Sequence, residues 1–210
     1  MTPAMTPATT EARHVLDLRN LERDVPGPRS GAWLGMLLFI VIEATVVAAM
    51  LTSHLYYRLA AREGWPPPGV EPSALLRPSL ALAALLASRT VVWALDGGRG
   101  ASRARARLSW GAGMALVVAY AVTTAFDLAL APYRGSDHIY GSVVWTTSGY
   151  QLLHALVLLL LATWAAVAEG RRASGRSSAV AASVTRLYWT FVALAAVPNY
   201  LVLYVMPHLS

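Results

Sequence analysis

The chain of 210 residues has no cysteine, no lysine and few charged residues. The absence of cysteine excludes a disulfide framework, a thiolate-held iron–sulfur cluster and haem attached through thioethers. Charged residues make up 13% of the chain and hydrophobic residues 56%, whereas soluble domains carry about 25% charged residues. The basic residues are all arginine, and most lie in short segments between apolar runs, which argues against a nucleic-acid partner. The composition predicts an integral membrane protein.

Long apolar runs occupy most of the chain, and each exceeds the roughly 20 residues that a helix needs to cross about 30 Å of hydrocarbon. No alternating barrel-strand pattern is present, so helices are the expected way to satisfy the backbone inside a bilayer. We therefore predict an all-α membrane protein, with a polar cytoplasmic tail over residues 1–30 and a five-helix transmembrane domain over residues 31–210. The expected helices cover about 31–57, 73–95, 108–131, 140–168 and 179–206.

The arginines predict the orientation of this bundle. Residues 1–30 lack the basic start and adjoining apolar stretch of a cleavable signal. Three arginines lie in the first and third loops between the expected helices: Arg58, Arg62 and Arg134. Many more lie in the tail and in the second and fourth loops: Arg13, Arg19, Arg23, Arg29, Arg99, Arg103, Arg105, Arg107, Arg171, Arg172 and Arg176. The positive-inside rule then places the N-terminus in the cytoplasm and the C-terminus outside.

Glu43 interrupts the first apolar run near its middle. At 1.5 Å per residue it lies about 16 Å into the helix, close to the bilayer midplane. An ionised carboxylate at that depth costs several kcal/mol unless it is paired, so an intramembrane acid indicates either a functional site or a hydrogen-bonded neutral acid that serves packing.

His154 lies at a similar depth in the fourth run, with Gln151 one turn earlier. A lone intramembrane histidine is more often a hydrogen-bonding residue than a ligand. A haem held between helices needs a second histidine at matching depth, and His54 lies instead near the outer end of the first run. Walker, dinucleotide-binding, HExxH and GxSxG motifs are absent, so the working parts of a hydrolase or an ATP-driven pump are missing.

Other polar residues in the runs have simpler interpretations. Asp127 lies near the outer end of the third run, where its side chain is expected to reach the interface. Arg77, Arg89 and Arg186 have long stems that can carry the charge to the headgroups. Trp33 belongs to a set of aromatic residues near the expected helix ends, as in an aromatic belt.

Several motifs resemble those of subunit III of the haem–copper cytochrome c oxidases. Residues 35–43 (GMLLFIVIE) are similar to the first core helix of that family, which carries a buried glutamate at this position. Residues 136–142 (SDHIYGS) and 148–154 (SGYQLLH) resemble the family's S-D-x-x-Y-G-S and G-[FY]-H-x-x-H, and residues 188–192 (YWTFV) resemble its Y-W-H-F-V. Asp127 falls where the family places an acidic residue ahead of the second motif.

The chain also departs from the family pattern. Gln151 and Thr190 stand where the family has histidines, and Ala193 replaces an aspartate, so part of the family's polar network is thinned. The chain resembles the five-helix bacterial form, without two further N-terminal helices that many homologues have.

The resemblance implies a non-catalytic accessory subunit with no cofactor of its own. The family packs on the haem- and copper-bearing subunit I, accompanies subunit II, binds phospholipids in a cleft beside its first two-helix group, and supports proton uptake and turnover stability. The complex can join a larger respiratory supercomplex in the bacterial inner membrane. By this resemblance Glu43 is the buried carboxyl. Its expected polar partners in the core are His154, Gln151 and Asp127. The lipid-binding candidates are Arg171, Arg172, His154 and Trp33.

Other functions remain open at the level of the sequence. A related accessory subunit of a nitric oxide reductase would share the motifs. A small proton-coupled transporter could use Glu43, although the chain has no repeated half-structure and no paired broken helices. A di-haem cytochrome b would show a Soret band.

Overall fold

The computed structural model describes residues 30–62, 64–95, 103–170 and 175–209. In these ranges the secondary structure is helical, with a helix in each of the five apolar runs. The predicted tail over residues 1–30 lies, except for Ser30, outside the described residues. The elements are α1 (Gly31–Ala60), α2 (Leu76–Leu95), α3 (Arg103–Ala129), α4 (Ile139–Gly170) and α5 (Gly175–Tyr200), followed by a π-helical turn, η3 (Leu201–Val205), and a 3-10 turn, η4 (Met206–His208).

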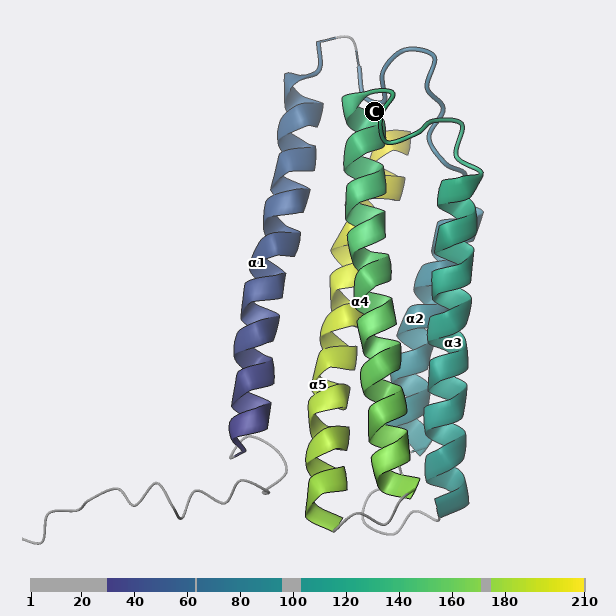
Figure 1. Cartoon of the computed structure of the whole chain (residues 1–210). Coiled ribbons are helices and arrows are strands. Elements are labelled where there is room, and N and C mark those ends of the chain that lie inside the picture. Colours follow the sequence, from purple (N-terminus) through teal and green to yellow (C-terminus); the bar gives the residue numbers. More distant parts are fainter. Residues whose placement is uncertain (1–29, 63, 96–102, 171–174, 210) are drawn as a thin grey trace, which may run out of the picture.

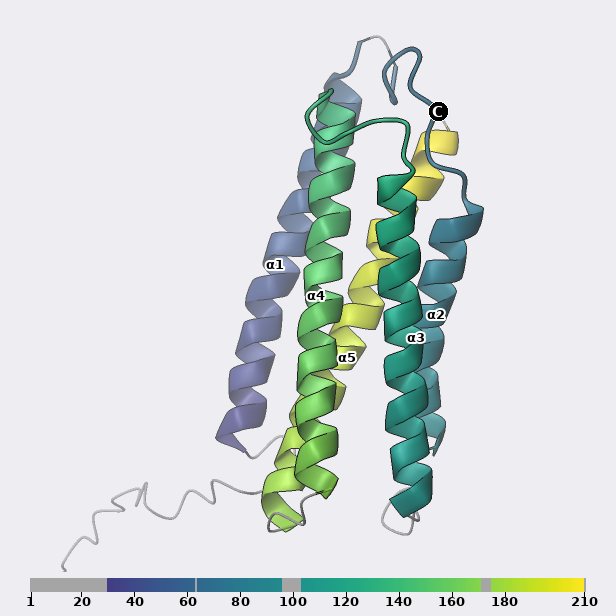
Figure 2. The same ribbon diagram turned by 45° about the vertical axis from the view of Figure 1, so that its right-hand side comes forward.

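The helices run nearly parallel to a common axis and form a bundle with one loosely attached member (Figures 1 and 2). Helix α2 packs closely on α3, α4 packs on α5, and contacts of α3 with α4 and of α2 with α5 join the two pairs. Helix α1 lies at the edge against α5 and α4. Only Val47 and His54 of α1 are buried, so most of this helix presents apolar side chains to its surroundings.

Small residues let the inner helices approach each other closely. Ala155, Ala162 and Ala181 are fully buried between helices, as small residues at membrane helix interfaces commonly are. Gly113 of α3 lies directly under the buried indole of Trp189, whose Nε1 donates to Ser88 Oγ on α2 at 2.8 Å. The core therefore combines close backbone approach with one buried hydrogen bond between α5 and α2.

The SDHIYGS segment forms the start of α4. Asp137 Oδ2 accepts from the backbone N–H of Arg134 at 2.8 Å, and His138 Nδ1 accepts from the N–H of Gly141, also at 2.8 Å. A Cβ on Gly141 would clash with the Arg134 carbonyl oxygen, so only glycine fits here. This motif thus fixes the loop between α3 and α4 and satisfies N–H groups that a helix start leaves free.

The last apolar run does not form one regular helix. The α-helical part ends at Tyr200, two residues after Pro198, and the chain continues as the π-helical turn Leu201–Val205. Proline has no N–H to donate within the helix and its ring crowds the preceding turn, which accounts for the change of geometry. The sequence range 179–206 therefore marks the right segment but not this distortion.

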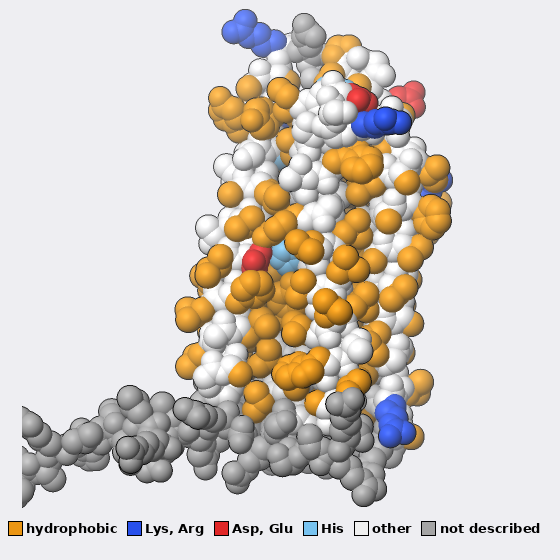
Figure 3. All heavy atoms as spheres, in the orientation of Figure 1, with side chains coloured by type: hydrophobic (Ala, Val, Ile, Leu, Met, Phe, Trp, Pro, Cys, Tyr) orange, Lys and Arg blue, Asp and Glu red, His pale blue; other side chains and the backbone are white. Residues whose placement is uncertain are grey.

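The surface of the bundle is apolar over its height, with basic side chains gathered toward the two ends (Figure 3). Among the described residues, four helical segments are long and apolar enough to cross a membrane: Gly31–Ala60, Ala104–Ala129, Ile139–Ala168 and Ser178–His208. Helix α2 contains Arg77 and Arg89 and is not among these segments, although its 20 residues span about 30 Å. The chain is a multi-pass membrane protein.

Candidate functional site

A small polar cluster lies between α1 and α4, where the sequence places an acid near the membrane midplane. The Tyr150 hydroxyl donates a short hydrogen bond to Glu43 Oε2, and His154 Nε2 lies 3.3 Å from the same oxygen. Tyr150 and His154 are one helical turn apart on α4, so both reach the same point on α1. The side chains of His154 and Glu43 are 5% and 16% exposed. The structure thus brings Glu43 and His154 together and adds Tyr150.

Hydrogen-bond chemistry limits where protons can lie in this cluster. His154 Nδ1 is 2.8 Å from the Tyr150 carbonyl oxygen, which can only accept, so Nδ1 carries a proton. The other nitrogen, Nε2, is close to Glu43 but not aligned for a hydrogen bond. The imidazole thus donates back along α4 through Nδ1 and turns Nε2 toward the Glu43 carboxyl.

Aromatic rings enclose the imidazole on its other sides. Tyr188 of α5 stacks on His154 with ring centroids 6.2 Å apart and planes 14° apart, and Phe191 lies at 5.7 Å. Tyr188 also contacts Phe39 of α1 at 6.1 Å. These rings make the surroundings of the pair apolar, which strengthens each polar interaction inside.

Gln151 belongs to a second network, facing α5 rather than Glu43. Its Nε2 donates to the Val192 carbonyl at 3.0 Å, and its Oε1 accepts from Asn199 Nδ2, also at 3.0 Å. Gln151 and Asn199 are both buried. The network ties α4 to the end of α5 just beyond Pro198.

The expectation that Asp127 reaches the interface is wrong. Its side chain is 5% exposed and lines an internal cavity among α2, α3, α4 and α5. Sequence depth placed it correctly along α3, but the rotation of the helix turns it inward. The arginines in the runs also make contacts inside the protein: Arg89 Nε donates to Thr190 Oγ1 at 2.7 Å, and the Arg186 guanidinium lies 5.8 Å from the Trp110 ring centre.

The lipid-binding candidates are placed only in part. Trp33 is half-buried in the first turn of α1, where its backbone N–H donates to the capping Ser30 Oγ at 3.1 Å. Arg171 and Arg172 lie outside the described residues. A lipid role for these residues and for His154 stays a prediction.

A separate aromatic cluster surrounds His54 near the opposite end of α1 from Ser30. Trp65 Nε1 donates to His54 Nε2 at 3.3 Å, and the rings of Trp65 and Tyr140 contact each other at 5.3 Å. His54 is fully buried and far along the helix from Glu43, in keeping with the expectation that it does not pair with His154. Among the described residues, no group of three histidine, cysteine, aspartate or glutamate side chains could hold a metal ion.

Sequence reasoning missed Tyr150 and Asn199. Tyr150 could have been found from its position one turn before His154, because residues four apart share a helix face. Asn199 follows Pro198, an unusual pair inside an apolar run, but nothing in the sequence shows which helix it faces. His138 lies in a loop, as expected, but its cap on α4 depends on the loop conformation.

The fold and the buried polar cluster define a polytopic helical membrane protein. Residues 24–208 match the family model described as cytochrome c oxidase subunit III, and the chain belongs to this family. The resemblance inferred from the motifs is therefore confirmed.

Curated relatives named cytochrome c oxidase subunit 3 show the same similarity. The protein of Pisaster ochraceus is 30% identical over 71% of this chain and 56% of its own length. That of Branchiostoma lanceolatum is 32% identical over 61% and 51%, and that of Yarrowia lipolytica is 29% identical over 63% and 52%. The chain thus spans about half the length of the curated relatives it matches.

Proposed function

We propose that this chain is a non-catalytic accessory subunit of a respiratory haem–copper oxidase. In this role it packs on the haem- and copper-bearing subunit I, accompanies subunit II, and carries no redox centre itself. The single observation that best supports the proposal, given the family, is the Glu43–Tyr150–His154 cluster, in which the glutamate of the matched first-helix motif contacts two side chains of α4.

The cluster supports proton uptake by its structure rather than by moving protons. Tyr150 and His154 both contact Oε2 of Glu43, and rings from α5 close the site. A carboxyl held in this way fixes α1 against α4, and α1 has few other buried contacts. Its role is to keep α1 in place, and with it the surface on which phospholipid is held.

Bound phospholipids are the ligands expected of the chain. Half-buried Trp33 at the start of α1, and Arg171 and Arg172 in the segment between α4 and α5, have the chemistry for inner-leaflet lipid: an amphipathic ring at headgroup level and guanidinium groups for phosphate. His154, which contacts Glu43 of α1, is the further candidate.

The topology proposed is five spans with the N-terminus in the cytoplasm and the C-terminus outside. Helix α2 is the fifth span, because its length matches the hydrocarbon thickness and it packs along α3. The arginine asymmetry supports the orientation. We place the protein in the inner membrane of a bacterium, since arginine without lysine is typical of GC-rich coding.

The proposal is tested by removing the chain from the oxidase. Cells lacking it should assemble subunits I and II with unchanged haem and copper content and near-normal initial turnover, but the oxidase should lose activity faster during turnover. Re-expression of the wild-type chain should restore the lifetime. A Soret band carried by this chain after separation from the other subunits would contradict the proposal, as would an unchanged lifetime without it.

A further inference from the structure

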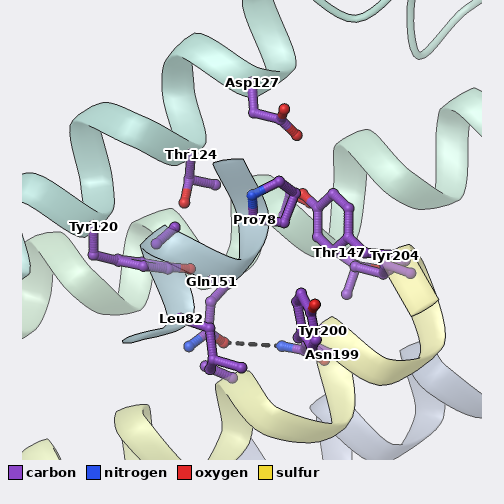
Figure 4. Close-up of a pocket in the computed structure, with 14 residues that line it drawn as sticks. Pro78, Leu82, Tyr120, Thr124, Asp127, Thr147, Gln151, Asn199, Tyr200 and Tyr204 are labelled. Carbon is purple, nitrogen blue, oxygen red and sulfur yellow. Dashed lines mark hydrogen bonds between the residues drawn. The ribbon is translucent and has the colours of Figure 1, made fainter. Parts of the chain in front are cut away.

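An internal cavity of about 40 Å³ lies among α2, α3, α4 and the end of α5, apart from the Glu43 cluster. Figure 4 shows Asp127 and Thr124 of α3 on one side of it, with Gln151 and Asn199 on the other. Its wall also carries the hydroxyl groups of Tyr120, Thr147, Ser148, Tyr200 and Tyr204.

The hydrogen bonds of the wall leave one acceptor free. The Val192 carbonyl can only accept, so Gln151 must turn its NH₂ group to it and its oxygen toward Asn199. Asn199 therefore uses its NH₂ group on Gln151, and its Oδ1 remains buried without a hydrogen-bond partner. Asn199 is 5% exposed. A buried acceptor in this state is unfavourable unless something donates to it.

Asp127 adds two carboxyl oxygens to the same cavity, and its side chain is also 5% exposed. The hydroxyl groups of the wall are mostly engaged. Tyr200 Oη pairs with Ser79 Oγ at 2.7 Å, and Ser148 Oγ pairs with Tyr204 Oη at 3.3 Å. The cavity therefore offers Asn199 Oδ1 as a buried acceptor that lacks a donor, with the Asp127 carboxyl on the same wall.

The end of α5 is shaped around this space. Pro198 breaks the regular hydrogen bonds, and the π-helical turn that follows places Leu203 and Tyr204 on the cavity wall beside Asn199. Single π turns inside helices occur often at functional sites. Here the distortion directs Asn199 at the cavity while α5 still packs on α4.

We propose that this cavity binds one to three water molecules that donate to Asn199 Oδ1 and to Asp127. A bound water molecule needs about 10–15 Å³ of cavity volume and two to four polar partners. The cavity of about 40 Å³ and the polar groups that line it meet both conditions. Water has two donors, so it joins two acceptors that could not bond to each other. The bound water adds a polar link from Asp127 of α3 to Asn199 of α5. This inference does not depend on the oxidase assignment.

Electron cryo-microscopy of the tagged full chain, purified in mild detergent with whatever partners accompany it, tests the proposal at a resolution that shows ordered water. We expect density for at least one water within 2.7–3.2 Å of Asn199 Oδ1, the usual hydrogen-bond range. Asn199→Leu removes the acceptor at similar size and should abolish this density. Leu201→Ala, in the same π turn but half exposed, should leave it unchanged.

Three results would overturn the proposal: no density in the wild-type cavity, an acyl chain in it, or an ion with oxygen distances near 2.4 Å and sodium-dependent occupancy. If Asn199→Leu does not accumulate, hydroxyl-radical footprinting of the wild-type chain decides independently. Radicals formed from a bound water should modify buried Tyr120, which is 6% exposed, at a rate well above that of buried Tyr188. Equal rates would contradict a water site here.

Discussion

Replacement of Glu43 separates its hydrogen-bonding role from its proton chemistry. In Glu43→Gln an amide NH₂ group in the place of Oε2 donates to the Tyr150 hydroxyl oxygen and toward His154 Nε2, so both neighbours keep a polar partner. Glu43→Leu removes both contacts. Hydrogen bonds between membrane helices contribute about 0.6 kcal/mol on average and at most about 1.7, so losing the Tyr150 hydrogen bond and the unaligned His154 contact costs about 1–2 kcal/mol. Glu43→Gln should stay within about 0.5 kcal/mol of the wild type.

Thermal unfolding followed by tryptophan fluorescence measures this difference, since the chain has 7 tryptophans. The proteins are compared in the same detergent and with the same partners, and Ile42→Leu, at a neighbouring exposed position of α1, is the control. A Glu43→Leu variant as stable as Glu43→Gln would refute the inference that Tyr150 and His154 hold α1 through Glu43. Oxidase turnover and proton pumping should remain nearly intact in Glu43→Gln. Loss of most pumping, with assembly and lipid content unchanged, would make Glu43 a direct proton carrier.

The remaining predictions concern packing, reactivity and topology. Gly113→Ala should destabilise the bundle by about 1–3 kcal/mol in thermal unfolding, because its Cβ would lie 2.5 Å from Val92 Cγ2 and 2.9 Å from Trp189 Cη2. Gly111→Ala, with nothing within 4 Å, should be neutral or stabilising by up to about 1 kcal/mol, and equal effects at the two sites would contradict the packing. A hydrophobic carbodiimide should label Glu43 in preference to the other acids by peptide mass spectrometry; uniform labelling would count against an apolar site around Glu43. Reporter fusions should be cytoplasmic after Gly100 and Gly175 and external after Pro68 and Ser210, whereas both termini on one side would remove a span.

The helices could be predicted from the sequence because apolar runs of this length have few alternatives in a bilayer. The helix ends differ from the prediction: α3 begins at Arg103, inside the segment expected to be a loop, and α2 begins at Leu76 rather than near Ser73. The π turn after Pro198 was not predicted, since a proline shows where a helix is perturbed but not which geometry replaces it.

The sequence predicts how deep each residue of the candidate site lies in the membrane, but not which neighbouring helix its side chain faces. Counting residues along each helix predicts that Glu43 and His154 lie at the same depth, and in the structure Glu43 Oε2 is 3.3 Å from His154 Nε2. The same counting misplaced Asp127, because depth says nothing of helix rotation, and rotation depends on packing with neighbours. It also set Gln151 beside His154 without revealing that Gln151 faces Asn199 on α5.

The most direct test of the accessory-subunit assignment is purification through a tag on this chain from its native membrane, in mild detergent, followed by mass spectrometry and a visible spectrum of the product. The assignment predicts recovery of a large multi-helix, haem-bearing subunit and a cupredoxin-bearing subunit in fixed proportion to the chain. Recovery of the chain alone, monodisperse and active in a transport or redox assay, would contradict it.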